Sequence, residues 1–367
     1  MKGAVRDGVF PGAVLAVRQG GVMQCLATAG HVSTEPPGNP VTPTTIYDLA
    51  SLTKPLVTAT SILLLVQAGR VGLSTPIGKI LAELEGAPIG SATMRDLLTH
   101  SSGLPGWRPL YERVNGAAIP GGDSVRNSVK QEVLQLVRNE PLIYQRGERC
   151  LYSDLGFILL GLAVERVGGI SLDQYFDEAV VGPLQAGPLL FAPLRPSMEQ
   201  PARISIDRSE IAPTEFDEWR GRLLWGEAHD ENVAAMGGVA GHAGLFGTAE
   251  AVLAVSGSWL RSHCGSTSIL DRDLVREFTK RQTIVRNSSW ALGWDTPTVP
   301  SSSGRHLSHE SFGHLGYTGT SLWIDPQCEL EVVLLSNRVH PTRRNEKIRE
   351  FRPLIHDVVY HEAGSRQ

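Results

Sequence analysis

Tyr47-Asp48-Leu49-Ala50-Ser51-Leu52-Thr53-Lys54-Pro55 runs from a strand-like segment directly into a long apolar pattern with helical spacing. The pattern predicts a helix from about Ser51 to Ala68, which Gly69 and the glycine and proline beyond it end. Residues i and i+3 share one face of a helix, so Lys54 is expected one turn beneath Ser51. The stretch therefore places a hydroxyl and an amine side by side at the start of a buried helix.

That pairing indicates a serine nucleophile. A serine hydroxyl attacks poorly without a nearby base. Burial of Lys54 is expected to lower its pKa, because desolvation disfavours the ammonium. The helix N-terminus would stabilise negative charge that develops on Ser51. The alternative is a helix-capping serine followed by a surface lysine.

Two further short patterns carry chemistry-bearing side chains. Tyr152-Ser153-Asp154 stands directly before a strongly apolar helix predicted for Leu155 to Val167. His314-Leu315-Gly316 precedes a strand predicted for Ser321 to Asp325. A glycine there would keep the strand edge open, so that a substrate could lie against it.

In this order, the three patterns resemble the serine β-lactamase and penicillin-binding protein superfamily, with its S-x-x-K motif. The resemblance covers nearly the whole chain. It is closest to the class C β-lactamase-like branch, which includes esterases, D-aminopeptidases and DD-carboxypeptidases. Supporting landmarks are Phe10-Pro11-Gly12-Ala13, the run Leu97 to Pro105, and Gly244-Leu245-Phe246-Gly247-Thr248-Ala249.

The resemblance implies a serine hydrolase that works through an acyl-enzyme on Ser51. Lys54 and Tyr152 would move the serine proton, provided that Lys54 depresses the pKa of the phenol. The backbone N–H groups of Ser51 and Tyr317 would form the oxyanion hole. The expected substrates are esters, D-amino-acid amides or peptides and, weakly, β-lactams.

Asp154, His314 and Gly316 are the expected substrate-binding residues, and two of them depart from the family pattern. Asp154 stands where the pattern has asparagine, and a carboxylate cannot donate to a substrate carbonyl. His314 stands where β-lactamases have a lysine that binds a substrate carboxylate, and neutral imidazole is a weaker anion anchor. Both departures make β-lactam hydrolysis the weakest of the expected activities.

The predicted fold class is α/β (α+β). Strand-like runs lie near both chain ends, at 13–17, 22–28, 321–325 and 331–336, and helices fill the middle. They are expected to pair in one antiparallel sheet flanked by helices, as the resemblance also implies. We predict a discontinuous sheet domain from 1–80 and 235–367, and an all-helical lobe at 81–234.

Composition excludes several classes of protein. The chain has 367 residues and a net charge of 34 − 38 = −4, so a nucleic-acid partner is not indicated. Its four cysteines form no CxxC pair, which gives no sign of a zinc or redox motif. The apolar stretch 55–69 is shorter than a membrane span and predicts a buried helix. We therefore expect a small-molecule or short-peptide substrate, no cofactor and no membrane span.

The N-terminus lacks the apolar core of a signal peptide. The sequence as written is therefore expected to be cytoplasmic, or periplasmic or secreted if an export signal was trimmed. It does not predict the oligomeric state. A DD-carboxypeptidase is the alternative within the family, and it would need export. A non-catalytic binding or sensing protein on the same fold is the alternative of another class, which the retained serine, lysine and tyrosine oppose.

Histidines outside these motifs offer one more alternative. His229-Asp230-Glu231-Asn232, with His242 further on, has residue types that bind divalent metals. Adjacent residues rarely converge on one ion, so a polar loop packed near the cleft is the favoured interpretation, and a metal-dependent hydrolase the alternative. His100, before a Ser-Ser-Gly turn, is expected to brace a loop.

Overall fold

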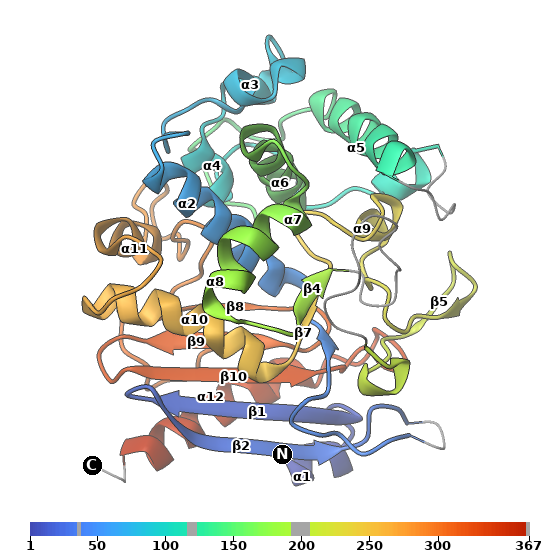
Figure 1. Cartoon of the computed structure of the whole chain (residues 1–367), viewed down its shortest axis with the longest axis vertical. Coiled ribbons are helices and arrows are strands. Elements are labelled where there is room, and N and C mark those ends of the chain that lie inside the picture. Colours follow the sequence, from blue (N-terminus) through green and yellow to red (C-terminus); the bar gives the residue numbers. More distant parts are fainter. Residues whose placement is uncertain (35–37, 116–122, 192–205, 365–367) are drawn as a thin grey trace.

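Strands from the two ends of the chain form one antiparallel sheet in a computed structural model that describes residues 1–34, 38–115, 123–191 and 206–364. The strand order is β2-β1-β10-β9-β8 (Figure 1). The bounds are β1 Gly12–Gln19, β2 Val22–Gly30, β8 Phe312–Leu315, β9 Ser321–Asp325 and β10 Leu330–Ser336. In the central pair, Ala13 lies opposite Ser336 and Gln19 opposite Leu330. The predicted pairing of the chain ends is confirmed, and so is the fold class.

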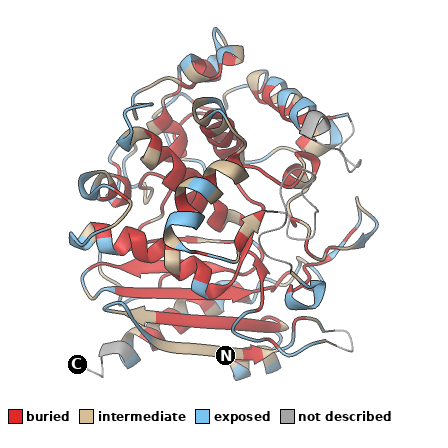
Figure 2. Ribbon diagram, viewed as in Figure 1, coloured by how far each residue is buried: buried red, intermediate tan, exposed pale blue. Residues whose placement is uncertain are grey.

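Both faces of the sheet are buried (Figure 2). Alternate side chains of β1 point to opposite faces, as the pleat requires. Val14 and Ala16 join the large core, which includes helix α10 (Ala249–Cys264). Ala13, Leu15 and Val17 pack instead with the C-terminal helix α12 (Ile348–Gly364). The sheet is thus the middle layer between helices.

The segment that carries Ser51 is less regular than the single helix predicted. Residues Ala50–Leu52 form a 3-10 turn, Lys54–Ala59 a wide π turn, and α2 (Thr60–Gln67) the ordinary helix. The widening begins at Pro55, whose ring removes a backbone donor and crowds the preceding turn. The carbonyl of Pro55 accepts a backbone N–H at the end of this turn and also the hydroxyl of Thr60 at 2.9 Å.

The same segment is apolar and long enough to match a membrane span by length and composition. In the structure, 78 % of the window Ala50–Gln67 is buried inside the protein. A second match, the pair Asp154–Gly168 and Leu172–Leu184, is bent by 74°. A mostly buried helix of this kind is typical of a protein core.

The remaining helices gather on one side of the sheet, in the upper part of Figure 1. They are α3 Ile77–Ile80, α4 Met94–Leu98, α5 Asp123–Arg138, α6 Asp154–Gly168, α7 Leu172–Phe176, α8 Gly182–Leu184, α9 Glu231–Ala235 and α11 Arg272–Thr279. The short helix α1 (Lys2–Arg6) lies beside α12 at the other end. The predicted domain boundaries stay a prediction.

Two small sheets complete the fold. One has the order β3-β7-β4, from Tyr47–Asp48, Leu245–Gly247 and Leu189–Phe191. The other pairs β5 (Phe216–Asp217) with β6 (Arg222–Leu223). The glycine- and proline-rich stretches 106–125 and 183–215 predict surface loops, and parts of both, at 116–122 and 192–205, lie outside the described residues. The first small sheet matters for the site, because β3 leads to Ser51.

Candidate active site

The backbone before Ser51 is held in an unusual conformation. Ala50 has φ of 48°, in the left-handed region that side chains with a Cβ seldom adopt. The backbone N–H of Ala50 donates to a carboxylate oxygen of Asp48 at 2.8 Å, and that of Leu49 to the carbonyl of Leu245 at 2.8 Å. Strain of this kind persists only where surrounding contacts enforce it, and it is common at functional sites. The turn delivers Ser51 to the first turn of the buried helix.

Lys54 lies beneath Ser51, as predicted, and its side chain is fully buried. Its ammonium donates to Oγ of Ser51 at 3.0 Å and to the carbonyl of His242 at 2.9 Å. Nζ also lies 2.7 Å from Oδ1 of Asp154. An ammonium has three protons, which the oxygens of Ser51, His242, Asp154 and Tyr152 share.

The predicted lowering of the Lys54 pKa is wrong. Burial does lower the pKa and is the largest single influence, but the Asp154 carboxylate and the Tyr152 oxygen together outweigh it. The pKa of Lys54 is therefore raised, so the resting side chain is an ammonium. The sequence reasoning missed this because it treated Asp154 as a substrate contact and not as a partner of Lys54.

Tyr152 completes the cluster around the serine. Its ring centroid lies 4.8 Å from Nζ of Lys54, and its hydroxyl hydrogen-bonds with Lys54 and Ser51. Burial raises its pKa more than the nearby ammonium lowers it, and the charge of Asp154 raises it further. The expected depression of the phenol pKa is therefore also wrong, and Tyr152 is a neutral phenol at rest.

His314 lies on β8, the edge strand of the main sheet. The sequence analysis predicts no strand at these residues. Its Nδ1 lies 2.8 Å from the carbonyl of Leu315 and can only donate to it, which leaves Nε2 as an acceptor. Within the described residues this buried Nε2 has no hydrogen-bond partner. Burial and then the charge of Lys54 lower the pKa of His314 to about 3. The imidazole is thus neutral, as expected.

Gly316 allows the β8–β9 loop to pack against the residues that precede Ser51. A Cβ at this position would lie 1.9 Å from Oγ1 of Thr320 and 2.5 Å from the carbonyl of Leu49. Thr320 itself donates to that carbonyl at 3.0 Å, and Thr318 donates to the carbonyl of Asp48 at 2.7 Å. The glycine is needed for this close approach, which sequence reasoning had not anticipated.

The same packing brings the Tyr317 segment to the serine. Among the described loop residues, the backbone N–H of Tyr317 has no hydrogen-bond acceptor in the protein. The side chain of Tyr317 is 50 % exposed. A free N–H in the segment that packs against the residues before Ser51 suits the predicted oxyanion hole.

His100 braces the segment that carries Tyr152, in agreement with the sequence prediction. Its Nδ1 accepts the backbone N–H of Ser153 at 3.0 Å. Its ring lies against Tyr152 and Trp290, with centroid distances of 4.7 and 4.4 Å. Burial and then the charge of Lys54 hold the pKa of His100 well below its usual range. Trp290 was not singled out from the sequence, because scattered tryptophans carry no positional signal.

The histidines considered for a metal site each have a carboxylate partner. Nε2 of His229 lies 2.8 Å from Glu215, and Nε2 of His242 lies 3.1 Å from Asp230. Asp230 also caps helix α9 through the N–H of Val233. Among the residues that the structure describes, no three His, Cys, Asp or Glu side chains are grouped as metal ligands. The loop reaches the site through the carbonyl of His242, which accepts from Lys54.

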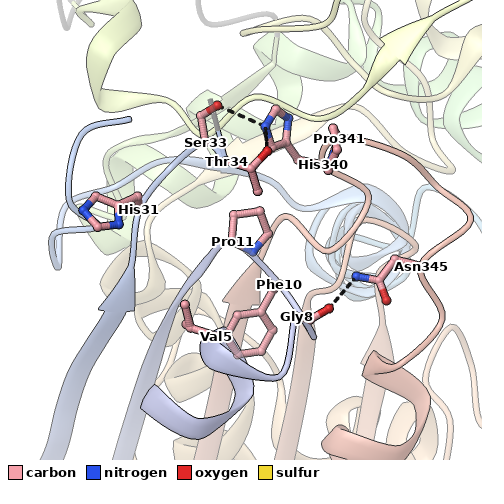
Figure 3. Close-up of a pocket in the computed structure, with 10 residues that line it drawn as sticks. All are labelled: Val5, Gly8, Phe10, Pro11, His31, Ser33, Thr34, His340, Pro341 and Asn345. Carbon is pink, nitrogen blue, oxygen red and sulfur yellow. Dashed lines mark hydrogen bonds between the residues drawn. The ribbon is translucent and has the colours of Figure 1, made fainter. Parts of the chain in front are cut away.

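A separate hollow of about 340 Å³ lies between the start of β1 and the residues that follow β10 (Figure 3). Nε2 of His340 lies 3.0 Å from the hydroxyl of Ser33 and 3.3 Å from that of Thr34. Asn345 donates to the carbonyl of Gly8 at 3.0 Å. These polar groups are bonded to the protein, and none of the predicted site residues lines the hollow.

Comparison with known proteins assigns the chain to a family. The sequence model described as Beta-lactamase matches residues 1–356. The chain belongs to the beta-lactamase family. This confirms the resemblance drawn from the three motifs, and it makes the chain a member of a hydrolase family.

Individual proteins that are similar to this chain carry different names. A protein of Escherichia coli (strain K12) named "Putative D-alanyl-D-alanine carboxypeptidase" is 32 % identical over 311 residues, which is 81 % of this chain and 70 % of that protein. An octameric penicillin-binding protein homologue from Pyrococcus abyssi has a TM-score of 0.69 at 22 % identity, over 91 % of this chain and 71 % of that one. EstCE1, a hydrolase with promiscuous acyltransferase activity, has a TM-score of 0.71 at 20 % identity, over 96 % of each chain. The two structures support the fold.

Proposed function

We propose that the protein is a serine hydrolase that forms an acyl-enzyme on Ser51. The contact that carries the proposal joins Nζ of the buried Lys54 to Oγ of Ser51 at 3.0 Å. A surface lysine after a helix-capping serine, the alternative interpretation, would be solvated, whereas this side chain is fully buried. A buried cation beside a hydroxyl, next to a neutral phenol, is an arrangement suited to moving protons during acyl transfer.

In this mechanism Ser51 attacks the substrate carbonyl. Its proton passes to Lys54, while Lys54 gives a proton to the carboxylate of Asp154 across their 2.7 Å contact. Lys54 thus stays an ammonium, and the net transfer is from Ser51 to Asp154. Tyr152, as a neutral phenol, protonates the leaving group and regains a proton from Lys54, which takes back the proton held by Asp154.

The backbone N–H groups of Ser51 and Tyr317 would hold the oxyanion of each tetrahedral intermediate. Water then attacks the acyl-enzyme in the reverse of the first half-reaction. Tyr152 passes its own proton through Lys54 to Asp154 as it accepts a proton from water, and Asp154 returns a proton through Lys54 to Ser51. The cycle uses only side chains and backbone groups of this chain, and Gly316 sets the position of the Tyr317 N–H.

The proposed substrates are small esters and D-amino-acid amides or short peptides, with β-lactams as weak substrates. His314 offers an uncharged acceptor where an ammonium would bind a substrate carboxylate. Asp154 is engaged with Lys54 and cannot donate to a substrate carbonyl. A substrate anchored by a carboxylate is therefore disfavoured.

A DD-carboxypeptidase is the second candidate. The names of relatives about 30 % identical over 84 % of this chain favour it. Such an enzyme must bind a C-terminal carboxylate. Hydrolysis of a D-alanyl-D-alanine peptide faster than of D-alanine amide would favour this candidate over the amide and ester substrates.

The first experiment measures hydrolysis of p-nitrophenyl butyrate by the wild type, Ser51→Ala and Lys54→Met, each with and without a chelator. We expect both variants to be inactive and the chelator to have no effect. Intact mass spectrometry of the wild type during turnover should show one butyryl group, and Ser51→Ala should show none. Activity that survives in Ser51→Ala would refute the assigned nucleophile, and loss of activity with chelator would favour a metal-dependent hydrolase.

A further inference from the structure

A buried arginine contacts the peptide unit that carries the proposed oxyanion donor. Arg352, on α12, donates through Nη2 to the carbonyl of Gly316 at 2.6 Å and to that of Thr320 at 2.8 Å. The Gly316 carbonyl and the Tyr317 N–H belong to the same peptide group. In a trans peptide these two groups point in opposite directions. Arg352 therefore lies on the side of this peptide opposite to the Tyr317 N–H, which is the proposed oxyanion donor.

Among the residues that the structure describes, no carboxylate forms an ion pair with Arg352. The residue is 6 % exposed, and Arg338 and Arg349 add further positive charge around it. Its Nε is buried and has no hydrogen-bond partner within the described residues. A buried, unpaired cation is costly to keep in a folded protein. The hydrogen-bond acceptors of Arg352 in the structure are the carbonyl groups of Gly316 and Thr320.

A cation bonded to a carbonyl polarises the whole peptide group. Hydrogen bonds in series strengthen one another, and the effect is larger where the dielectric constant is low. The Tyr317 N–H thereby becomes a stronger donor. Negative charge on the substrate oxygen grows in the transition state, so a stronger donor there accelerates the reaction more than it improves substrate binding.

We propose that Arg352 is a positioning residue for the oxyanion hole, and that its positive charge acts on the reaction through the Gly316–Tyr317 peptide. The inference rests on the proposed function, because it needs the Tyr317 N–H to bind the oxyanion. It extends the site to the opposite layer of the fold, since α12 packs on the face of the sheet away from the core that contains α2 and α10 (Figure 1).

The test compares Arg352→Lys, Arg352→Gln and Arg352→Met. Lysine keeps the charge and a donor, glutamine keeps a donor without the charge, and methionine keeps neither. The readouts are kcat and KM for p-nitrophenyl butyrate and the inhibition constant of phenylboronic acid, whose tetrahedral adduct with Ser51 resembles the intermediate. Arg349→Gln is the matched control, because it removes the same charge from an exposed position three residues earlier. Thermal unfolding shows which variants are folded.

We expect Arg352→Gln and Arg352→Met to lower kcat about tenfold, less than loss of a whole oxyanion donor, with a small change in KM. Phenylboronic acid should bind more weakly by a similar factor, and Arg352→Lys should retain most of both. If glutamine serves as well as lysine, or all three variants match the wild type, the electrostatic role is wrong. If all three lose activity equally while folded, Arg352 only anchors the loop, which also overturns the proposal. Ser51→Ala separates these results from the mechanism itself: residual activity in that variant would refute the proposed function.

Discussion

The ammonium of Lys54 lies 2.7 Å from the carboxylate of Asp154 and 3.0 Å from the hydroxyl of Ser51. This pair reverses the electrostatic state expected from burial alone, because the carboxylate raises a lysine pKa that desolvation would lower. An ammonium cannot itself accept the serine proton. The carboxylate that holds it in the charged state is also the nearest group that can take a proton from it.

Asp154→Asn tests this role of the carboxylate. The variant removes the proton acceptor behind Lys54 and leaves the lysine buried without a counter-ion, so its pKa should fall. We expect kcat for p-nitrophenyl butyrate to fall by about 10- to 100-fold at neutral pH, within the usual range for loss of an acid–base group. The pH profile of kcat should shift at the same time. Unchanged kcat and an unchanged profile would show that Asp154 takes no part in proton transfer.

Gly316→Ala tests the close approach of the β8–β9 loop. The added methyl group would meet Oγ1 of Thr320 and the carbonyl of Leu49, so the loop must move away from Ser51. We expect kcat to fall by about 100-fold, as for loss of an oxyanion donor, and the free energy of unfolding to fall by about 1–3 kcal/mol. Gly3→Ala is the control, since Gly3, like Gly316, has no positive φ, and a Cβ there would meet only the end of the Arg6 side chain at 3.8 Å. A fully active Gly316→Ala would contradict the assigned geometry.

The sequence predicted the sheet because its strands show regular alternation or continuous apolar runs. The sequence predicted that strands from both chain ends share one sheet, but it did not predict which of them pair, as β1 does with β10. β8 was missed because Phe312-Gly313-His314-Leu315 is short and contains a glycine, so that only its neighbour β9 gives it a strand conformation. The π turn after Lys54 was missed because apolar spacing does not distinguish it from an ordinary helix.

The contacts of the site that join residues close in the sequence could be predicted. Ser51 and Lys54 are one turn apart, so their contact follows from helix geometry. The pKa direction of Lys54 depends on Asp154, about 100 residues away in the sequence, and that of Tyr152 depends first on its burial in the fold, so neither could follow from a local motif. The contact of Arg352 with Gly316 joins helix α12 to the β8–β9 loop, and no local sequence pattern predicts it.

Acid should destabilise the protein partly through His356. Burial, and then the charge of Arg352, lowers its pKa to about 3, and neither ring nitrogen has a partner in the described residues. An unfolded histidine titrates near 6.5, so between about pH 6.5 and 3 the unfolded chain binds a proton that the folded chain does not. The stabilisation of the neutral form is therefore lost as pH falls through this window.

His356→Leu should reduce that loss. We expect the slope of unfolding free energy against pH, measured by urea denaturation from pH 6.5 to 4, to fall by up to about 1.4 kcal/mol per pH unit. The exposed His309 provides the control variant His309→Leu, which should leave the slope unchanged. An identical slope in His356→Leu and the wild type would show that His356 is protonated in the folded protein.

The buried pair of Arg18 and Glu331 should matter for stability and not for catalysis. Arg18 bonds to both carboxylate oxygens, at 2.6 and 2.8 Å, and the Glu331 side chain is 1 % exposed. The carboxylate also accepts from the hydroxyl of Ser256, so the pair ties β1 and β10 to helix α10.

Removing one partner leaves a buried charge uncompensated, and Glu331→Gln should lower the free energy of unfolding by about 3–5 kcal/mol. The double variant Arg18→Met with Glu331→Met should be more stable than Glu331→Gln, because two apolar side chains replace the pair without an orphaned charge. Urea unfolding measures all three proteins, and kcat per folded molecule should be unchanged. A double variant as unstable as the single one would show that the pair contributes more than mutual neutralisation.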